Sequence, residues 1–303
     1  MQISMTSDYC GGTGDFHRPL RMIGEAGFTH IMWCHQWNTD FIYTSCEIDE
    51  IKKAMRDYGI ALLDIHGSAG VEKSWFSEIE YRRRAGVDMV RNRIEMMDAL
   101  EGTGTVVMHS PALRFRNYFA SDEEMEAATK LNTLRYDSMR RSIDELLPVL
   151  EKYQVKLAIE NTITETWEML NRTFAAYPAH LVGLCYDSGH CNIKYDGTGE
   201  FAACADRLIC THLHDNDGLG DLHQPPFYGT IDWEKVTSII AGAKDLGIIN
   251  FEIVMKNTPH FNAELAVSEQ SDDSHRAFLA ECYEKCSKIV NMVETKRAAR
   301  KKS

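Results

Sequence analysis

Short apolar segments alternate with amphipathic segments from one end of the chain to the other, and this alternation limits the folds that it can adopt. Eight segments are rich in apolar and β-branched residues, as strands buried on both faces of a parallel sheet are. They span residues 2–7, 30–37, 60–67, 105–111, 155–162, 181–189, 209–217 and 248–255. The segments between them have helical periodicity, most clearly over residues 47–59, 85–102, 131–153 and 232–247.

Eight strands in strict alternation with helices predict a (β/α)8 barrel (a TIM barrel), for which about 250 residues is the usual length. The chain has 303 residues and no linker, low-complexity stretch or helical repeat. A doubly wound open sheet would need a glycine-rich phosphate loop after the first strand, and GGTGDFH matches G-x-G-x-x-G poorly. We therefore expect a single α/β domain over residues 1–303, with a C-terminal helix and basic tail from about residue 262, and no nucleotide cofactor.

Charge and cysteine content narrow the class of protein. The formal net charge of −12 disfavours a nucleic-acid partner, because contacts to phosphates supply most non-specific affinity for nucleic acids. No apolar run approaches the roughly 20 residues of a membrane-spanning helix, and the N-terminus does not resemble a secretory signal. Nine cysteines without such a signal indicate reduced thiols. We expect a cytoplasmic protein that does not bind membranes.

The ends of the predicted strands carry an unusual number of histidines and acids. In a TIM barrel, functional residues lie at the C-terminal ends of the strands and in the loops that follow. In chain order these positions hold His35, Asp64, His66, His109, Glu160, Asn161, Asp187, His190, His212, His214, Asp215, Asp217, Asp221, His223 and Glu252. Each residue alone has a structural explanation, such as a helix N-cap for an aspartate. Together they predict one polar site at the mouth of the barrel.

So many carboxylates and imidazoles in one mouth would leave desolvated like charges facing one another unless a cation lay between them. Carboxylate and imidazole ligands suit Mn, Zn, Mg or Fe. We therefore predict one divalent metal ion, with a second or third as an alternative. His212 and His214 point to the same side of their strand because the side-chain period is two. We expect His214, nearer the end of the strand, to be the ligand and His212 to pack behind it.

Several of these segments resemble one known superfamily. LAIENT (157–162), YDSGH (186–190), THLHDNDGLGDLHQPPFYGTIDW (211–233) and NFEIV (250–254) are similar to the xylose-isomerase-like TIM barrels. That superfamily holds the sugar phosphate isomerases and epimerases together with the apurinic-site endonuclease family 2. The similarity in organisation extends over nearly the whole chain. Its most specific feature is the combination of Glu on strand five, Asp-x-x-His on strand six, His-x-His on strand seven and Glu on strand eight.

The resemblance implies a set of site residues. The metal would be bound by Glu160, Asp187, His214 and Glu252, and the two glutamates, well separated around the ring of strands, would also be the catalytic base and acid. His190 would face the substrate or a further metal. Further contacts to the substrate are expected from residues around the mouth: His66, His109, His190, His223, Asp221, Trp33, His35 and Lys256.

The chemistry implied by the resemblance is that of a metal-dependent sugar isomerase or epimerase. Such an enzyme removes a proton next to a carbonyl, forms an enediolate and returns the proton. The loop over residues 214–229 is acidic and holds no Lys or Arg, which favours an unphosphorylated sugar. The same proton abstraction can lead to β-elimination, so a lyase acting on a sugar or glycoside remains an alternative. The aromatic residues near the mouth would also suit a homo-oligomer in which one chain covers its neighbour's site.

The endonuclease group is the second alternative, because the sequence offers candidates for a three-metal set. These are His66, His109 and Glu160; Glu160, Asp187, His214 and Glu252; and His190, Asp221 and His223. The negative charge and the lack of Lys/Arg-rich stretches weigh against a DNA substrate. Asp221 also follows His214 by only seven positions, closer than we expect for that group. A barrel kept for binding alone would have no need of the two glutamates.

Overall fold

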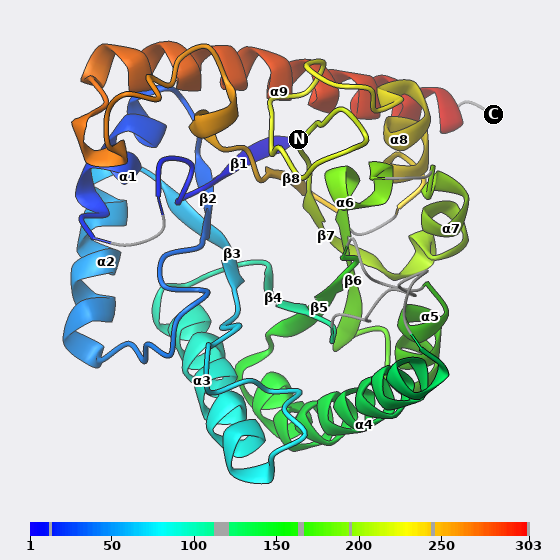
Figure 1. Ribbon diagram of the computed structural model, residues 1–303. Coiled ribbons are helices and arrows are strands. Elements are labelled where there is room, and N and C mark those ends of the chain that lie inside the picture. The colour runs from blue at the N-terminus through cyan, green and yellow to red at the C-terminus, as the bar shows by residue number, and fades with distance from the viewer. Residues whose placement is uncertain (12–13, 112–120, 163–166, 194–195, 244–245, 302–303) are drawn as a thin grey trace.

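The eight predicted strands are all present and form a barrel (Figure 1). The computed structural model describes residues 1–11, 14–111, 121–162, 167–193, 196–243 and 246–301. The parallel strands follow the order β7-β6-β5-β4-β3-β2-β1-β8. Their bounds are β1 Gln2–Thr6, β2 His30–Trp33, β3 Ala61–His66, β4 Thr105–His109, β5 Lys156–Glu160, β6 Val182–Asp187, β7 Leu208–His212 and β8 Ile248–Phe251. The predicted (β/α)8 fold is confirmed.

The last two strands close the ring at the level of the mouth. An isolated parallel bridge joins Leu213 to Phe251, through hydrogen bonds from Leu213 N to Asn250 O (3.1 Å) and from Glu252 N to Leu213 O (3.1 Å). One layer lower, the Thr211 hydroxyl accepts from Asn250 N (3.1 Å) and donates to Asn250 O (3.2 Å). A side chain thus supplies part of the hydrogen bonding between β7 and β8. The closure also ties Glu252 to the segment that carries the two strand-seven histidines.

The longer helices lie outside the ring of strands, and the short helix α6 follows directly on the end of β6 (Figure 1). The bounds of the helices are α1 His17–Glu25, α2 Ser45–Tyr58, α3 Glu80–Ala99, α4 Asp122–Tyr153, α5 Trp167–Ala176, α6 Ser188–Asn192, α7 Thr198–Ala203, α8 Trp233–Ile240 and α9 Asp272–Arg300, with short 3-10 turns η1 Ala205–Arg207, η2 Met255–Asn257 and η3 Val267–Glu269. None of the helices in the described ranges combines the length and apolar composition needed to cross a membrane.

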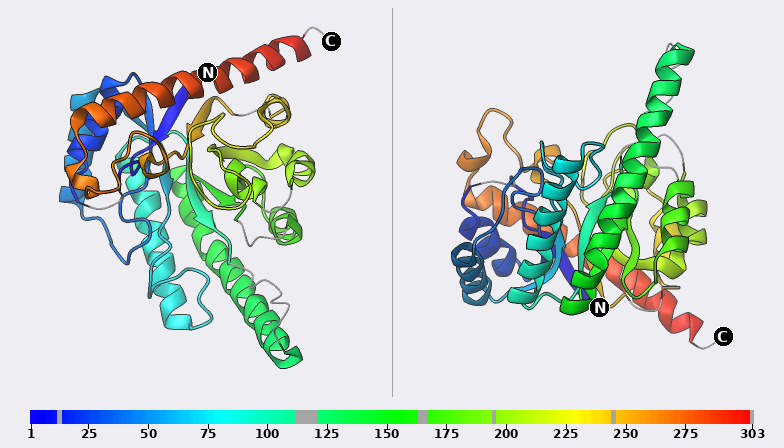
Figure 2. Two further views of the ribbon diagram at one scale, coloured as in Figure 1. Left: turned by 45° about the horizontal axis from the view of Figure 1, so that its top comes forward. Right: turned by 90° about the horizontal axis from the view of Figure 1, so that it is seen from below.

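Two helices start about ten positions away from the start that the sequence predicts, and α8 ends at Ile240 rather than at residue 247. The helix α4 begins nine positions before the predicted start, because Ser121 and Glu124 form a capping box, and its N-terminal half projects beyond the barrel (Figure 2). The helix α9 begins at Asp272 rather than near residue 262. Ser271 is its N-cap, and the Ser271 side chain accepts a hydrogen bond from Ser274 N. Residues 262–271 instead form a loop that contains η3.

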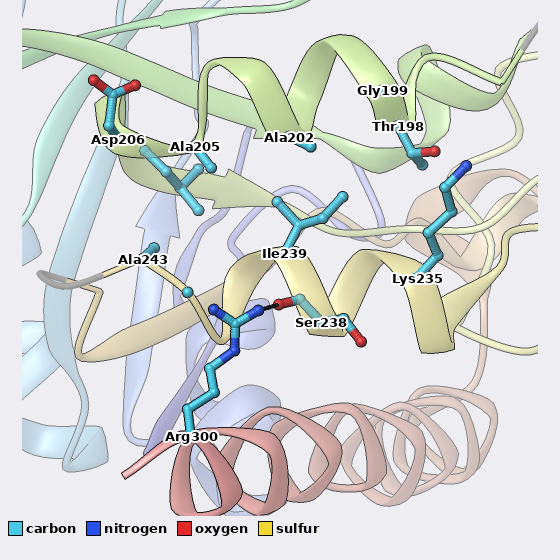
Figure 3. A pocket seen from close by; sticks show the side chains of 12 residues that line it. Thr198, Gly199, Ala202, Ala205, Asp206, Lys235, Ser238, Ile239, Ala243 and Arg300 are labelled. Atoms are coloured by element: carbon cyan, nitrogen blue, oxygen red, sulfur yellow. Dashed lines mark hydrogen bonds between the residues drawn. The ribbon is translucent and has the colours of Figure 1, made fainter. Parts of the chain in front are cut away.

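The basic C-terminal end of α9 is partly docked on the barrel. Arg297 donates to the carbonyl oxygens of Leu246 (3.0 Å) and Ala243 (3.1 Å). Arg300 donates to Ser238 O (2.9 Å) at the edge of a cavity of about 670 Å³ that lies between α7, α8 and the end of α9 (Figure 3). This cavity is outside the barrel, and its lining includes none of the predicted site residues.

A small buried layer lies inside the barrel beneath the mouth. It consists of Val107, Ala158, Cys185 and Cys210, from four neighbouring strands. Each of these residues precedes a polar strand-end residue by two positions on its own strand, so the two side chains point to the same side. The layer therefore lies directly beneath the side chains of His109, Glu160, Asp187 and His212.

The hydrogen bonds of Thr211 generate a test of the closure. Replacing Thr211 by Val keeps the shape but leaves Asn250 N without its acceptor, in a buried position. We expect the free energy of unfolding to fall by about 1–3 kcal/mol in denaturant titrations. Thr133→Val, which removes an exposed hydroxyl bonded within α4, is the control and should change it by less than about 0.5 kcal/mol. Equal stability of the two variants would contradict the role of Thr211.

Candidate active site

The carboxylate of Glu160 lies at the centre of the strand-end cluster and is surrounded by imidazoles. Its Oε2 is 3.0 Å from Nδ1 of His212 and 3.3 Å from Nε2 of His109, and its Oε1 is 3.2 Å from Nδ1 of His190. Glu160 is only 1% exposed. Within the described ranges neither oxygen has a hydrogen-bond partner, because the rings do not meet it at hydrogen-bonding angles. Buried acceptor atoms are left facing a common centre.

Glu160 belongs to a group of four potential ligands. Glu160, Asp187, His212 and Glu252 each offer one donor atom, and these atoms lie within 4.8 Å of one another. Glu252 Oε2 is 2.9 Å from the same Nδ1 of His212 that Glu160 approaches. The two glutamates come from strands that are well separated around the ring, yet they converge, as the predicted shared metal requires. Side chains that point inward from β5 and β8 approach one another at the barrel axis.

The two histidines of strand seven approach different acids: His212 lies beside Glu160 and Glu252, and His214 lies beside Asp187. His212 was expected to pack behind His214, yet its Nδ1 lies in the four-residue group. His214 Nε2 is 3.1 Å from each oxygen of Asp187, while its Nδ1 has no hydrogen-bond partner in the described chain. The spacing of two predicted correctly that both rings point inward. Which of them binds a metal stays a prediction: His212 belongs to the four-residue group, and His214 lies beside one of its acids, Asp187.

The backbone around Asp187 holds its carboxylate in place. Asn161 Nδ2 donates to Asp187 O (2.9 Å), and Asp187 N donates back to Asn161 Oδ1 (2.8 Å). Asp187 also caps α6, since its Oδ1 accepts from His190 N (2.6 Å). The cap starts α6 immediately after β6 and directs the His190 ring back over the site, where Nδ1 lies 3.0 Å from Asn161 O.

A second group assembles from the loop after β7. Asp221 Oδ2 is 3.3 Å from Nε2 of His190 and 3.1 Å from Nε2 of His223. His223 adopts a left-handed backbone (φ 47°), and its Nδ1 is 2.9 Å from Glu252 O. Its ring stacks on that of His214, with centroids 3.9 Å apart. The short spacing between His214 and Asp221 therefore does not prevent this group from forming.

A third group of potential ligands includes Glu160 and packs against an aromatic ring. His66, His109 and Glu160 offer donor atoms within 4.8 Å of one another. The ring of Trp37 lies 4.4 Å from that of His66 and 5.6 Å from that of His109, between centroids. Trp37 is half-buried. Trp37 is one of the aromatic residues that the sequence places near the mouth, although it was not among the residues expected to contact the substrate.

Two predicted substrate contacts are buried in the packing around β2, and a third is exposed and stays a prediction. Trp33 is 1% exposed and donates to Tyr43 Oη (2.9 Å), so it is a core residue without a face toward a substrate. His35 is also buried, 5.0 Å from the Trp33 ring and 3.4 Å from Ser7 Oγ. Both belong to the packing outside the four-residue group, because β2 ends at Trp33 and the chain then turns. Lys256 is exposed on η2.

Two further acids at strand ends have other roles. Asp215 is fully buried and accepts from Trp233 Nε1 (2.9 Å) and Phe227 N (2.9 Å), so it shapes the loop between β7 and α8. Asp8 follows β1 and bonds to the Thr6 hydroxyl. Burial raises the pKa of Asp8, and the charge of Glu252 raises it further. Asp8 thus lies within electrostatic range of Glu252, a position that the sequence pattern did not predict.

Close contacts between carboxylates and imidazoles shift the pKa values of both kinds of group in the site. Burial disfavours ionisation of Glu160, but the charges of His212 and His109 outweigh it and hold the pKa of Glu160 well below its ordinary value. Burial would lower the pKa of His212, yet Cys185 and Glu252 raise it well above the ordinary value. The hydrogen bond to Asp221 likewise overcomes burial and raises the pKa of His223 to about 10.

The residues fit a divalent metal. Oxygen and nitrogen atoms that lack hydrogen bonds converge at one point, and the donor set of carboxylates plus imidazole is one that Mn, Zn, Mg or Fe accepts. Such an ion would take the place of the protons that the imidazoles otherwise hold beside the acids, since ligands must be deprotonated to bind.

Comparison with known proteins places this barrel in a family. The model of the xylose isomerase-like TIM barrel family matches residues 20–278, and the chain belongs to this family. A relative from Sinorhizobium fredii, the uncharacterized protein y4fM, is 30% identical over 259 residues, which cover 78% of this chain and 80% of the relative.

Solved structures share the fold at low sequence identity. A D-tagatose 3-epimerase-like protein has a TM-score of 0.69 and 17% identity and covers 96% of this chain and 100% of its own. The 3-keto-D-glucoside 4-epimerase YcjR from E. coli has a TM-score of 0.65 and 19% identity, covering 93% and 100%. The IOLI protein, solved with a zinc atom, has a TM-score of 0.65 and 14% identity, covering 97% and 99%.

The packing of His214 generates a test of the site. A Cβ on Gly189 would lie 1.9 Å from Cε1 of His214, so Gly189→Ala must displace this ring. We expect the affinity for a divalent ion to fall about 10- to 100-fold, measured by titration with Mn²⁺ or Zn²⁺. Gly199→Ala is the control, because its Cβ would meet nothing within 4 Å. An unchanged affinity in the Gly189 variant would show that His214 does not support the metal.

Proposed function

We propose that this protein is a divalent-metal-dependent sugar isomerase or epimerase that moves a proton on the carbon next to a carbonyl. The observation that carries the proposal is the convergence of Glu160, Asp187 and Glu252 on His212, with buried oxygens and nitrogens that lack hydrogen bonds. Membership of the xylose isomerase-like family and the sugar epimerases among its structural neighbours support it. The zinc atom of IOLI supports a metal in this type of barrel.

The metal would be held by Glu160, Asp187 and Glu252 together with His212 or His214. When bound, such an ion would act as a Lewis acid toward the carbonyl oxygen and the neighbouring hydroxyl of the sugar. Three carboxylates around a divalent ion leave one negative charge, which the nearby imidazoles balance.

The two glutamates differ in their access to a substrate. The Glu252 side chain is 13% exposed and that of Glu160 is 1% exposed. We assign Glu252 the removal of the proton, because it is the one closer to the open mouth, while Nδ1 of His212 holds its carboxylate at 2.9 Å. Glu160 is its partner for the return of the proton. The carbon that receives the proton decides between epimerisation and isomerisation.

The mouth offers both polar and aromatic contacts for a sugar. The side chains of His109, His190 and His223 are 25%, 10% and 20% exposed, respectively, and carry ring nitrogens at the rim. Trp37 presents a flat apolar face beside them. A few placed polar groups next to an aromatic surface are the usual composition of a small-molecule site. We expect the sugar hydroxyls to bind the histidines and the sugar ring to lie near Trp37.

Replacing Glu252 by Gln tests the proposal. The amide cannot accept the proton, so we expect solvent-deuterium incorporation into a panel of free keto sugars to fall about 100-fold or more relative to the metal-loaded wild type. Glu264→Gln, at an exposed loop position, is the control and should keep the wild-type rate. Metal content is measured in each variant, and release of a β-substituent from the substrate in place of proton return would identify β-elimination. Wild-type exchange by the Glu252 variant would refute the assignment.

One observation favours a second candidate, a multinuclear metal hydrolase like the apurinic-site endonucleases of the same superfamily. The three groups centred on His66, Glu160 and His223 all assemble, and Glu160 belongs to two of them. A glutamate shared between metals would be a poor base. The net charge of −12 remains unfavourable for a DNA substrate, because phosphate contacts dominate such affinity.

The metal content of a His223→Ala variant separates the two candidates. For the isomerase or epimerase we expect no change in metal per chain, because His223 contacts the substrate rather than the ion. A multinuclear hydrolase should lose about one equivalent. His260→Ala is the control, since His260 bonds to Glu281 outside the site. Elemental analysis of the purified, zinc- or manganese-loaded proteins gives the answer, and a loss confined to the His223 variant would favour the hydrolase.

A further inference from the structure

Two cysteines lie directly beneath the carboxylate cluster and take no part in the proposed reaction. Cys185 on β6 and Cys210 on β7 are paired neighbours in the strand register. They precede Asp187 and His212 by two positions, so their thiols point into the barrel, as the inward layer requires. Cys185 is 0% and Cys210 is 2% exposed. Together with His212, they place three potential donor atoms within 4.8 Å of one another.

One ring nitrogen of His212 is not occupied by the carboxylates. Its Nδ1 lies against Glu160 and Glu252, at 3.0 and 2.9 Å. Neither ring nitrogen has a hydrogen-bond partner in the described residues, although the side chain is fully buried, and only Nδ1 has a carboxylate beside it. A buried nitrogen without a partner costs about 1–3 kcal/mol. The second nitrogen of the ring is therefore available to a ligand that the carboxylates do not hold.

An acid lies beside the thiols. Asp64 Oδ2 is 3.5 Å from Cys210 Sγ, while Oδ1 accepts from Thr105 N (2.6 Å) and Thr105 Oγ1 (2.9 Å). A Cβ on Gly104 would lie 2.2 Å from Asp64 Oδ1, so this glycine leaves room for the carboxylate. Asp64 is almost completely buried, and a carboxyl group in that position needs partners.

A cavity reaches Asp64 and Cys210 from the end of the barrel opposite the mouth. This cavity of about 340 Å³ is lined by residues at the N-terminal ends of β4, β5 and β8, and it also reaches Thr105. An ion could therefore enter without passing through the carboxylate cluster.

We propose that Cys185, Cys210 and His212 form a second metal site, for a thiophilic divalent ion such as zinc, with Asp64 as the nearest oxygen for a fourth position. Zinc binds thiolate sulfur, imidazole nitrogen and carboxylate oxygen in tetrahedral sites, and thiolates select it over the hard ions that oxygen ligands prefer. Two thiolates balance its charge in the apolar interior. The site shares His212 with the carboxylate cluster, but neither thiol contributes to the sugar chemistry, so the cobalt test does not need an activity measurement.

Cobalt distinguishes this site from the carboxylate cluster. Co²⁺ bound by thiolates absorbs in the near ultraviolet through charge transfer from sulfur, whereas Co²⁺ bound by oxygen and nitrogen alone does not. The full-length protein is stripped of metal, loaded with Co²⁺ and examined by absorption spectroscopy and elemental analysis. We expect a thiolate band and, in Cys185→Ser and Cys210→Ser, its loss together with about one equivalent of bound cobalt.

Two variants serve as controls. Cys286→Ser changes a thiol buried on α9 and should keep the band. Asp187→Asn should reduce the cobalt bound by the carboxylate cluster and leave the band in place, so a failure of the proposed reaction is separable from a failure of this site. Cobalt-loaded wild-type protein without a thiolate band overturns the proposal even if the serine variants do not fold. A band that survives in both variants also overturns it, and the thiols are then apolar packing.

Discussion

The buried carboxylate of Glu160 is the constraint on which the rest of this structure depends. A charge removed from water costs several kcal/mol unless oppositely charged or hydrogen-bonding groups surround it. Here the barrel supplies imidazoles from three directions: His109 from β4, His212 from β7 and His190 from the first turn of α6. Glu252, Asp187 and Asp221 then pair with the same rings. The site is a network in which Glu160, His190 and His212 each approach more than one oppositely charged group.

The scaffold holds this network through hydrogen bonds near the strand ends. Asn161 links the ends of β5 and β6 by two bonds to the backbone of Asp187. Ser188 links β6 to the strand-seven segment, since its hydroxyl donates to His214 O (2.7 Å) and accepts from His214 N (3.0 Å). Thr211 does the same between β7 and β8. Small polar residues next to the functional residues thus fix the backbone of the functional residues. Their side chains therefore lose little conformational entropy when they come together.

The strands and the composition of the site were predictable from local pattern, and the arrangement within the site was not. All eight strands follow from apolar runs, and Glu160, Asp187, His190 and Glu252 follow from their position after those runs. Trp33 and His35 occupy equivalent positions but turn into the core, because the chain bends after β2 and Phe16 and Tyr43 pack against them. Trp37, four residues beyond Trp33, faces the site instead. Sequence position alone cannot separate these residues, since packing partners far along the chain decide which way they turn.

The amino-acid sequence by itself determined the alternation of strands and helices, the concentration of histidines and acids at the strand ends, and the inward direction of both His212 and His214. These properties depend on periodicity, which is local. Only the tertiary structure decided that Glu160 and Glu252 meet at one nitrogen, that Asp221 reaches both His190 and His223, and that Cys185 and Cys210 lie beneath them. Those contacts depend on how parallel strands stagger around the closed barrel and on where each loop folds back, and both are set by long-range packing.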